Sequence, residues 1–102
     1  MSRKKSIITD PERRECYLCM SPRDLEWHHI IHGTANRRIS DKYGLAVWLC
    51  HSCHEALHSS PDELWRVKDH ALMAAAQSKF EDLYGHDKWM ELFRKNYVTT
   101  QE

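Results

Sequence analysis

In residues 50–58 the chain reads Cys50-His51-Ser52-Cys53-His54-Glu55-Ala56-Leu57-His58, which joins a Cys-x-x-Cys pair to two histidines four residues apart. A second pair lies upstream, with 30 residues between the two pairs. Four thiolates at this spacing can close one tetrahedral zinc site, and such a site has no open position for chemistry. The sequence therefore predicts one structural Zn2+ held by Cys16, Cys19, Cys50 and Cys53. The alternatives are four unligated thiols or a redox pair, although the βαβ setting of thioredoxin-like redox motifs is missing.

The histidines form a second, separate group. His54 and His58 are four apart, so on a helix they project from one face and can bind one ion. His28 and His29 are adjacent in residues 25–31, which read as a short strand. Adjacent strand side chains point to opposite sides, so one imidazole can reach an ion while the next stays free to take a proton. If His54 and His58 were ordinary surface or core histidines, the preceding pair would have no explanation.

These stretches resemble the HNH, or His-Me finger, nuclease family. The residues that carry the resemblance are Leu25-Glu26-Trp27-His28-His29-Ile30 and Leu49 through His58. With the intervening residues 33–38 and 40–45, the segment looks most like small HNH proteins encoded by phages and prophages. The resemblance covers roughly Cys16 to His58, a little under half of the chain. It implies an α+β fold: a small zinc-stapled ββα-metal core followed by a C-terminal helical extension.

The resemblance also implies the chemistry. By the family's pattern, His28 binds a catalytic divalent metal together with His54 and His58, and His29 is the general base. The implied reaction is hydrolysis or nicking of DNA phosphodiester bonds, with 5′-phosphate and 3′-hydroxyl ends. Three imidazoles favour a transition metal over magnesium, which prefers oxygen ligands. Mg2+, Mn2+, Ni2+ and Zn2+ all remain open as the catalytic ion, and so does the choice between DNA and RNA.

The chain departs from the family at the asparagine that precedes the second strand and holds the base histidine. Gly44 or Leu45 stands at that position. We predict that Asn36 takes over, accepting a hydrogen bond from a ring N–H of His29. Asn36 could instead stabilise a turn, and a backbone carbonyl could orient His29. The departure keeps two rivals open: a non-catalytic zinc module that binds DNA or protein, and a small phage-derived inhibitor or adaptor.

The chain divides into three predicted parts. Residues 1–12 read as a flexible basic arm, residues 13–59 as the zinc-bound core, and residues 60–102 as a helical extension packed on it. Within the core we expect strands at 25–31 and 45–49, a helix from about 52 to 59, and a polar loop with room for one helical turn at 33–43. In the extension, Ser60-Pro61-Asp62-Glu63 predicts a capped helix with proline at its first position, ending near Gly85, and residues 87–97 predict a shorter helix.

Charge and the remaining histidines are less informative. Net charge is zero, but residues 1–50 carry nine Lys and Arg against six Asp and Glu. Arg37, Arg38 and Lys42 are candidates for phosphate contacts, or they belong to a solvated loop. His32, His51, His70 and His86 read as bystanders, with His51 the one that could share the face of His54, and Trp27 and Trp48 as core residues.

The sequence also suggests where the protein works. No apolar run approaches a membrane span, and the basic start has no apolar segment after it, so we expect no membrane contact. An intracellular, reducing compartment of a bacterial cell is expected, for a protein of bacterial or phage origin, because there Cys-x-x-Cys pairs favour zinc over disulfides. The extension either only caps the core or also binds DNA, a second copy, or a host or phage protein.

Overall fold

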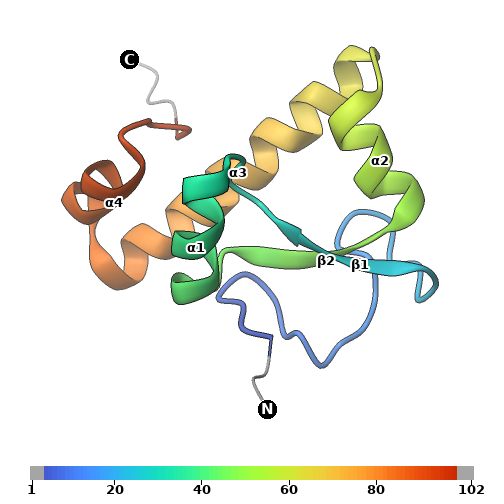
Figure 1. Cartoon of the computed structure of the whole chain (residues 1–102), viewed down its shortest axis with the longest axis horizontal. Coiled ribbons are helices and arrows are strands. Elements are labelled where there is room, and N and C mark those ends of the chain that lie inside the picture. The colour runs from blue at the N-terminus through green and yellow to red at the C-terminus, as the bar shows by residue number, and fades with distance from the viewer. Residues whose placement is uncertain (1–3, 99–102) are drawn as a thin grey trace.

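The computed structural model describes residues 4–98, which form one small α+β unit. Its elements are β1 (Leu25–His29), α1 (Thr34–Tyr43), β2 (Ala46–Cys50), α2 (His51–Ser59), α3 (Glu63–Tyr84) and α4 (His86–Phe93). Figure 1 shows α3 running past the two-stranded sheet, from α2 at one end to α4 at the other. The predicted α+β class is confirmed. Within residues 4–98, no helix combines the length and the apolar character needed to cross a bilayer.

The register of the sheet separates the two adjacent histidines. β1 and β2 pair antiparallel, with Trp27 opposite Trp48 and His28 opposite Val47. Directly opposite residues share a face, and neighbours along a strand alternate. His28 and Val47 therefore lie on the face toward α2, while Trp27, His29 and Trp48 lie on the other face. The Trp48 indole N–H donates to the Pro11 carbonyl at 2.9 Å, so the N-terminal segment covers part of that second face.

This N-terminal segment is not the free arm that its polarity suggested. Residues 1–3 lie outside the described residues, but Ile7 and Ile8 pack against the hydrophobic core. The Ile7 N–H donates to the Gly44 carbonyl at 2.8 Å, and Lys5 Nζ donates to the Lys42 carbonyl at 2.9 Å. Ile7 and Ile8 are half-buried, so each gains part of the about 1.5–3 kcal/mol that full burial of an aliphatic side chain contributes.

Residues 34–43 form a ten-residue helix, so the predicted loop is wrong. Tyr43 packs against the core and Ser40 is buried, whereas the other residues of α1, apart from Ala35 and Ile39, are polar, and this composition suggested a loop. Gly44 ends the helix in the left-handed region at φ 74°, with its N–H bonded to the Ser40 carbonyl. A Cβ there would lie 3.1 Å from the Ile7 backbone nitrogen, so the position cannot take an asparagine without strain.

The extension shares one core with the strands. The Leu72, Ala76, Phe80 and Trp89 side chains join Ile30, Leu45, Val47 and Leu49 in a single cluster. Leu64 and Leu83 share the helical period of these buried residues but are 53% and 60% exposed, because the two ends of the 22-residue helix extend beyond the surface that it covers. The N-cap is Asp62, whose carboxylate accepts from the Leu64 N–H at 3.1 Å, so Pro61 precedes the cap rather than following it. α3 ends just before Gly85, as predicted. α4 ends at Phe93 and not at residue 97, because the next residue, Arg94, adopts a left-handed backbone conformation.

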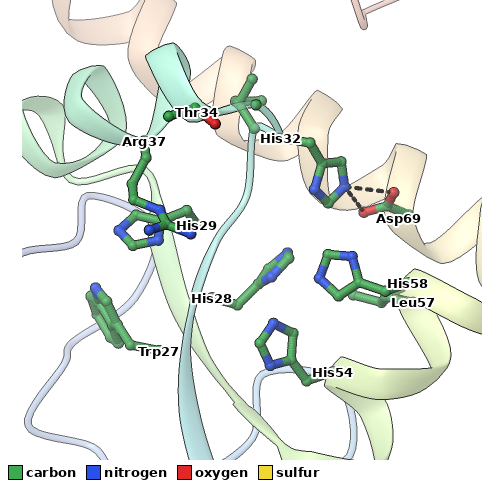
Figure 2. Close-up of a pocket in the computed structure, with 12 residues that line it drawn as sticks. Trp27, His28, His29, His32, Thr34, Arg37, His54, Leu57, His58 and Asp69 are labelled. Carbon is green, nitrogen blue, oxygen red and sulfur yellow. Dashed lines mark hydrogen bonds and ion pairs between the residues drawn. The ribbon is translucent and has the colours of Figure 1, made fainter.

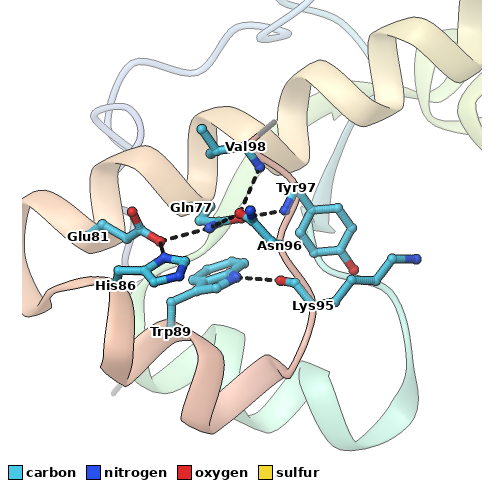
Figure 3. Close-up of polar contacts among 8 residues, drawn as sticks. All are labelled: Gln77, Glu81, His86, Trp89, Lys95, Asn96, Tyr97 and Val98. Atoms are coloured by element: carbon cyan, nitrogen blue, oxygen red, sulfur yellow. Dashed lines mark hydrogen bonds and ion pairs between the residues drawn. The ribbon is translucent and has the colours of Figure 1, made fainter. Parts of the chain in front are cut away.

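A buried amide ties the end of the described chain to α3 (Figure 3). Gln77 is fully buried and donates to Glu81 Oε2 and Asn96 Oδ1, both at 2.7 Å. The side-chain oxygen Oε1 of Gln77 accepts a hydrogen bond from the Tyr97 backbone N–H at 2.6 Å. Beside it, the Trp89 indole donates to the Lys95 carbonyl at 2.8 Å. The segment after α4 is therefore held by hydrogen bonds in addition to apolar packing.

Replacing Gln77 by leucine should destabilise the protein by about 1–3 kcal/mol, because it leaves the Tyr97 N–H and the Asn96 amide without their buried partner. The measurement is the midpoint of thermal unfolding, with the exposed neighbour Ser78→Ala as control. Equal unfolding midpoints for Gln77→Leu and wild type would show that this network does not stabilise the fold.

Candidate metal centres and active site

The four cysteines meet as predicted. The four Sγ atoms lie within 4.8 Å of one another, and none of them is in a disulfide; they belong to Cys16, Cys19, Cys50 and Cys53. The Cys19 and Cys50 sulfurs are 3.7 Å apart. A tetrahedral ion with metal–sulfur bonds of about 2.3 Å would place its sulfurs about 3.8 Å from one another. The cluster could therefore hold a metal ion such as zinc with little movement.

Backbone hydrogen bonds bring the two cysteine pairs together. The first pair sits in the loop before β1, where the Tyr17 N–H donates to the Trp48 carbonyl and the Cys16 N–H to the Ser21 carbonyl, both at 2.8 Å. Cys50 ends β2, and Cys53 lies in the first turn of α2.

The surroundings of the four thiols shift the pKa of Cys16 and the pKa of Cys53 in opposite directions. Burial opposes ionisation of the Cys16 thiol, but hydrogen bonds from the backbone of Cys50, Cys19 and Leu18 outweigh it and lower its pKa to about 7. Burial and the neighbouring sulfurs raise the pKa of Cys53. A cation among the sulfurs would favour the thiolate form of all four.

The second constellation lies in a cavity of about 600 Å³ between β1, α2, the start of α1 and α3 (Figure 2). One nitrogen from each of His28, His54 and His58 lies within 4.8 Å of the other two. Their ring centroids are 5.0 Å apart for His28–His54 and His54–His58, and 5.6 Å apart for His28–His58. The structure thus brings together the three histidines that the sequence suggested as ligands.

His28 is the buried member of this cluster. Its side chain is 2% exposed, and its Nε2 is buried without a hydrogen-bond partner in the described residues. Burial, followed by repulsion from His54, His32 and His58, lowers the pKa of His28 to about 3. The ring is therefore neutral at physiological pH, with a lone pair available. An orphaned, neutral imidazole beside two others suits a divalent cation.

Glu26 orients a ligand histidine from the strand. Its carboxylate accepts from His54 Nδ1 at 2.6 Å and from His51 Nδ1 at 2.9 Å, and these bonds lower the pKa of Glu26. His54 Nε2 then remains for an ion, in the manner of the carboxylate–histidine pairs of metal sites. Among the described residues, His51 contacts the histidine cluster through Glu26. No function was predicted for Glu26, although its place two residues before His28 puts both on one face of β1.

His29 lies on the other side of β1 from His28 but lines the same cavity (Figure 2). Its Nε2 donates to Asp41 Oδ1 at 2.7 Å. The predicted contact from Asn36 is not formed: the Asn36 amide donates to the His32 carbonyl at 2.7 Å. Once residues 34–43 coil into a helix, Asn36 lies in the first turn, and Asp41 in the last turns reaches His29. No spacing rule could link Asp41 to His29 while the segment was interpreted as a loop.

Of the three basic residues of α1, one lines the histidine cavity and two do not. Arg37 lines the cavity, and Figure 2 places it near His29. Arg38 and Lys42 are exposed on the same helix and do not line that cavity. Of the three predicted phosphate contacts, Arg37 is therefore the one placed to meet a group bound in the cavity.

A fourth histidine borders the cluster. His32, in the turn after β1, donates from Nε2 to Asp69 Oδ2 at 2.9 Å, with Oδ1 at 3.2 Å. Its ring lies 5.2 Å from that of His58 and 5.8 Å from that of His28. The hydrogen bond that His32 donates to Asp69 raises the pKa of His32. His32 was predicted to be a bystander, because Asp69 is 37 residues away on α3 and no motif connects them.

Comparison with protein-family models, with curated proteins and with solved structures found no match for this chain.

Proposed function

We propose that this protein is a metal-dependent nuclease of the HNH type that hydrolyses DNA phosphodiester bonds. The observation that carries the proposal is the division of two adjacent histidines between two sides of one cavity. His28 joins His54 and His58 in a cluster with metal-ligand spacing, and His29 lies across β1 against Asp41. We also propose that the four cysteines hold a structural zinc, which leaves chemistry to the histidine side.

The histidine cluster supplies the electrostatic part of the reaction. His28, His54 and His58 would hold a divalent ion, which when bound provides positive charge for the scissile phosphate and the leaving oxygen. Arg37 is placed to add a charge-assisted hydrogen bond to a phosphate in the same cavity. Arg38 and Lys42, exposed on α1, would contact the backbone further along the strand.

His29 is the proposed general base. Because its Nε2–H donates to Asp41, the neutral ring has its lone pair on Nδ1, which can accept a proton from the attacking water. Asp41 is then a positioning residue: it fixes the tautomer and the direction of the ring. In the resembled family an asparagine has this task, and here a carboxylate from α1 would replace it.

Asp41→Ala should lower the cleavage rate roughly tenfold or more, because it releases the ring of the base from its productive direction. Asp41→Asn keeps an acceptor oxygen and should recover part of that loss. Since the Asp41 side chain is 62% exposed and belongs to neither ligand group, metal content and unfolding temperature should not change. Asn36→Ala is the matched variant, and a larger loss of rate there than in Asp41→Ala would contradict the assignment.

The direct test is incubation of the purified protein with supercoiled plasmid and Mg2+, Mn2+, Ni2+ or Zn2+, with relaxed and linear products quantified over time. Cleavage that depends on one of these ions and is lost on chelation is the expected result. Binding of plasmid without cleavage under every ion would reject the nuclease and favour a zinc module that only binds DNA.

A further inference from the structure

We propose that His32 is a fourth protein ligand of the ion at His28, His54 and His58, with Asp69 of α3 as its orienting carboxylate. The inference rests on the histidine site of the proposed function. It extends that site beyond the strand–helix core, into the helical extension.

The first support is the packing of the rings. The His32 ring lies 5.2 Å from His58, closer than the 5.6 Å between His58 and His28. It also lies 5.8 Å from His28. His32 thus borders two of the three ligand rings at distances close to those among the ligands themselves. The ligand atoms of His28, His54 and His58 already lie within 4.8 Å of one another, whereas His32 lies outside this set, so its ring would have to move toward the cluster to bind the same ion.

The second support is that one ring nitrogen of His32 remains available to bind an ion. Asp69 accepts from His32 Nε2 with both oxygens in reach, so Nδ1 is the nitrogen that keeps a lone pair. Figure 2 shows Asp69 and the three other histidines on different sides of the His32 ring. His54 has the same arrangement with the two ring nitrogens exchanged: Nδ1 donates to Glu26, and Nε2 keeps the lone pair for an ion. Metal sites commonly use this carboxylate–histidine pairing, because it fixes the ring and raises its basicity as a ligand.

The third support is the placement of Asp69 itself. Its side chain is only 18% exposed, and it lines the histidine cavity from α3. A largely buried carboxylate is costly unless it is paired with positive charge or hydrogen-bond donors. Asp69 accepts a hydrogen bond from His32 in the cavity, and a divalent ion bound on the other side of the His32 ring would further offset the cost of burying the carboxylate charge.

A fourth imidazole narrows the kind of ion. Four protein ligands close a tetrahedral zinc site and leave no place for a phosphate oxygen. Ions that accept five or six ligands, such as Mn2+, Co2+ or Ni2+, would keep open positions with four imidazoles bound. The geometry therefore points to an ion of this group as the one that supports cleavage, with Zn2+ as a tight but inhibitory occupant.

The test is Ni2+ binding by calorimetry to protein that holds one zinc per chain, so that the cysteine site is filled and the histidine site is free, in wild type, His32→Ala, His32→Gln and Asp69→Asn, with the exposed His70→Ala as matched control. We expect affinity to fall at least tenfold in both His32 variants and about 10–100-fold in Asp69→Asn. His70→Ala should bind as wild type. X-ray absorption of the nickel-loaded proteins should count one imidazole fewer in the His32 variants.

Unchanged Ni2+ affinity in His32→Gln would overturn the inference, since that variant keeps a polar contact for Asp69 and tests the ligand alone. A fall in affinity with the same imidazole count would also overturn it, because His32 would then act from outside the coordination sphere. These measurements do not involve DNA. A protein that loses an imidazole with His32 but never cuts plasmid would reject the nuclease proposal and leave this inference standing.

Discussion

Replacing Cys16 by serine should remove the structural zinc and unfold the protein together. Cys16 is fully buried, and its sulfur lies within 4.8 Å of those of Cys19, Cys50 and Cys53. In small zinc domains the apparent binding energy of the metal, about 10–16 kcal/mol, is largely folding energy. That amount equals or exceeds the total stability of about 5–15 kcal/mol expected of such a domain. The loop before β1, the end of β2 and the start of α2 would all lose their common attachment.

The measurements are zinc per chain by elemental analysis and the thermal unfolding curve. Ser52→Ala is the matched control, because Ser52 is exposed between the cysteines of the second pair. Treatment of wild type with a strong chelator should reproduce the behaviour of Cys16→Ser. A Cys16→Ser protein with its zinc and its unfolding temperature intact would show that the cysteines do not form a structural site.

The proposed function predicts that His29→Ala abolishes plasmid cleavage while the protein keeps its fold and the metal content of wild type. A general base contributes about 10²–10⁴-fold to a rate, so the variant should cut at about 1% of the wild-type rate or less. Metal content should not change, because His29 lies across β1 from the cluster formed by His28, His54 and His58. His58→Ala should do the reverse, weakening the binding of the catalytic ion first.

Three readouts separate these effects: the rate of supercoiled plasmid relaxation at saturating metal, the metal content, and the unfolding temperature. His70→Ala, an exposed histidine outside the cavity, controls for the loss of an imidazole as such. Wild-type cleavage by His29→Ala, or loss of its catalytic ion, would mean that the division of tasks between His28 and His29 is wrong.

The sequence by itself determined the local parts of this site. Cys-x-x-Cys spacing, the interval of four between His54 and His58, and the adjacency of His28 and His29 are short-range constraints. Each acts through one turn, one helix face or one strand, so side-chain direction follows from the backbone period alone. The strands and α2 lie within two residues of their predicted bounds for the same reason. The end of α3 at Gly85 was likewise readable, because glycine is a common helix stop.

Only the tertiary structure decided which groups support these residues. Asp41 reaches His29 because residues 34–43 form a helix, although their largely polar composition suggested a loop. Asn96 meets Gln77, Pro11 meets Trp48, and Asp69 meets His32, the last two pairs across 37 residues each. Contacts of this length depend on how whole elements pack around a shared core, and polar partners carry no periodic signal of their own. The candidate ligands could be predicted from spacing, whereas the carboxylates that contact His29, His32 and His54 were revealed only by the fold.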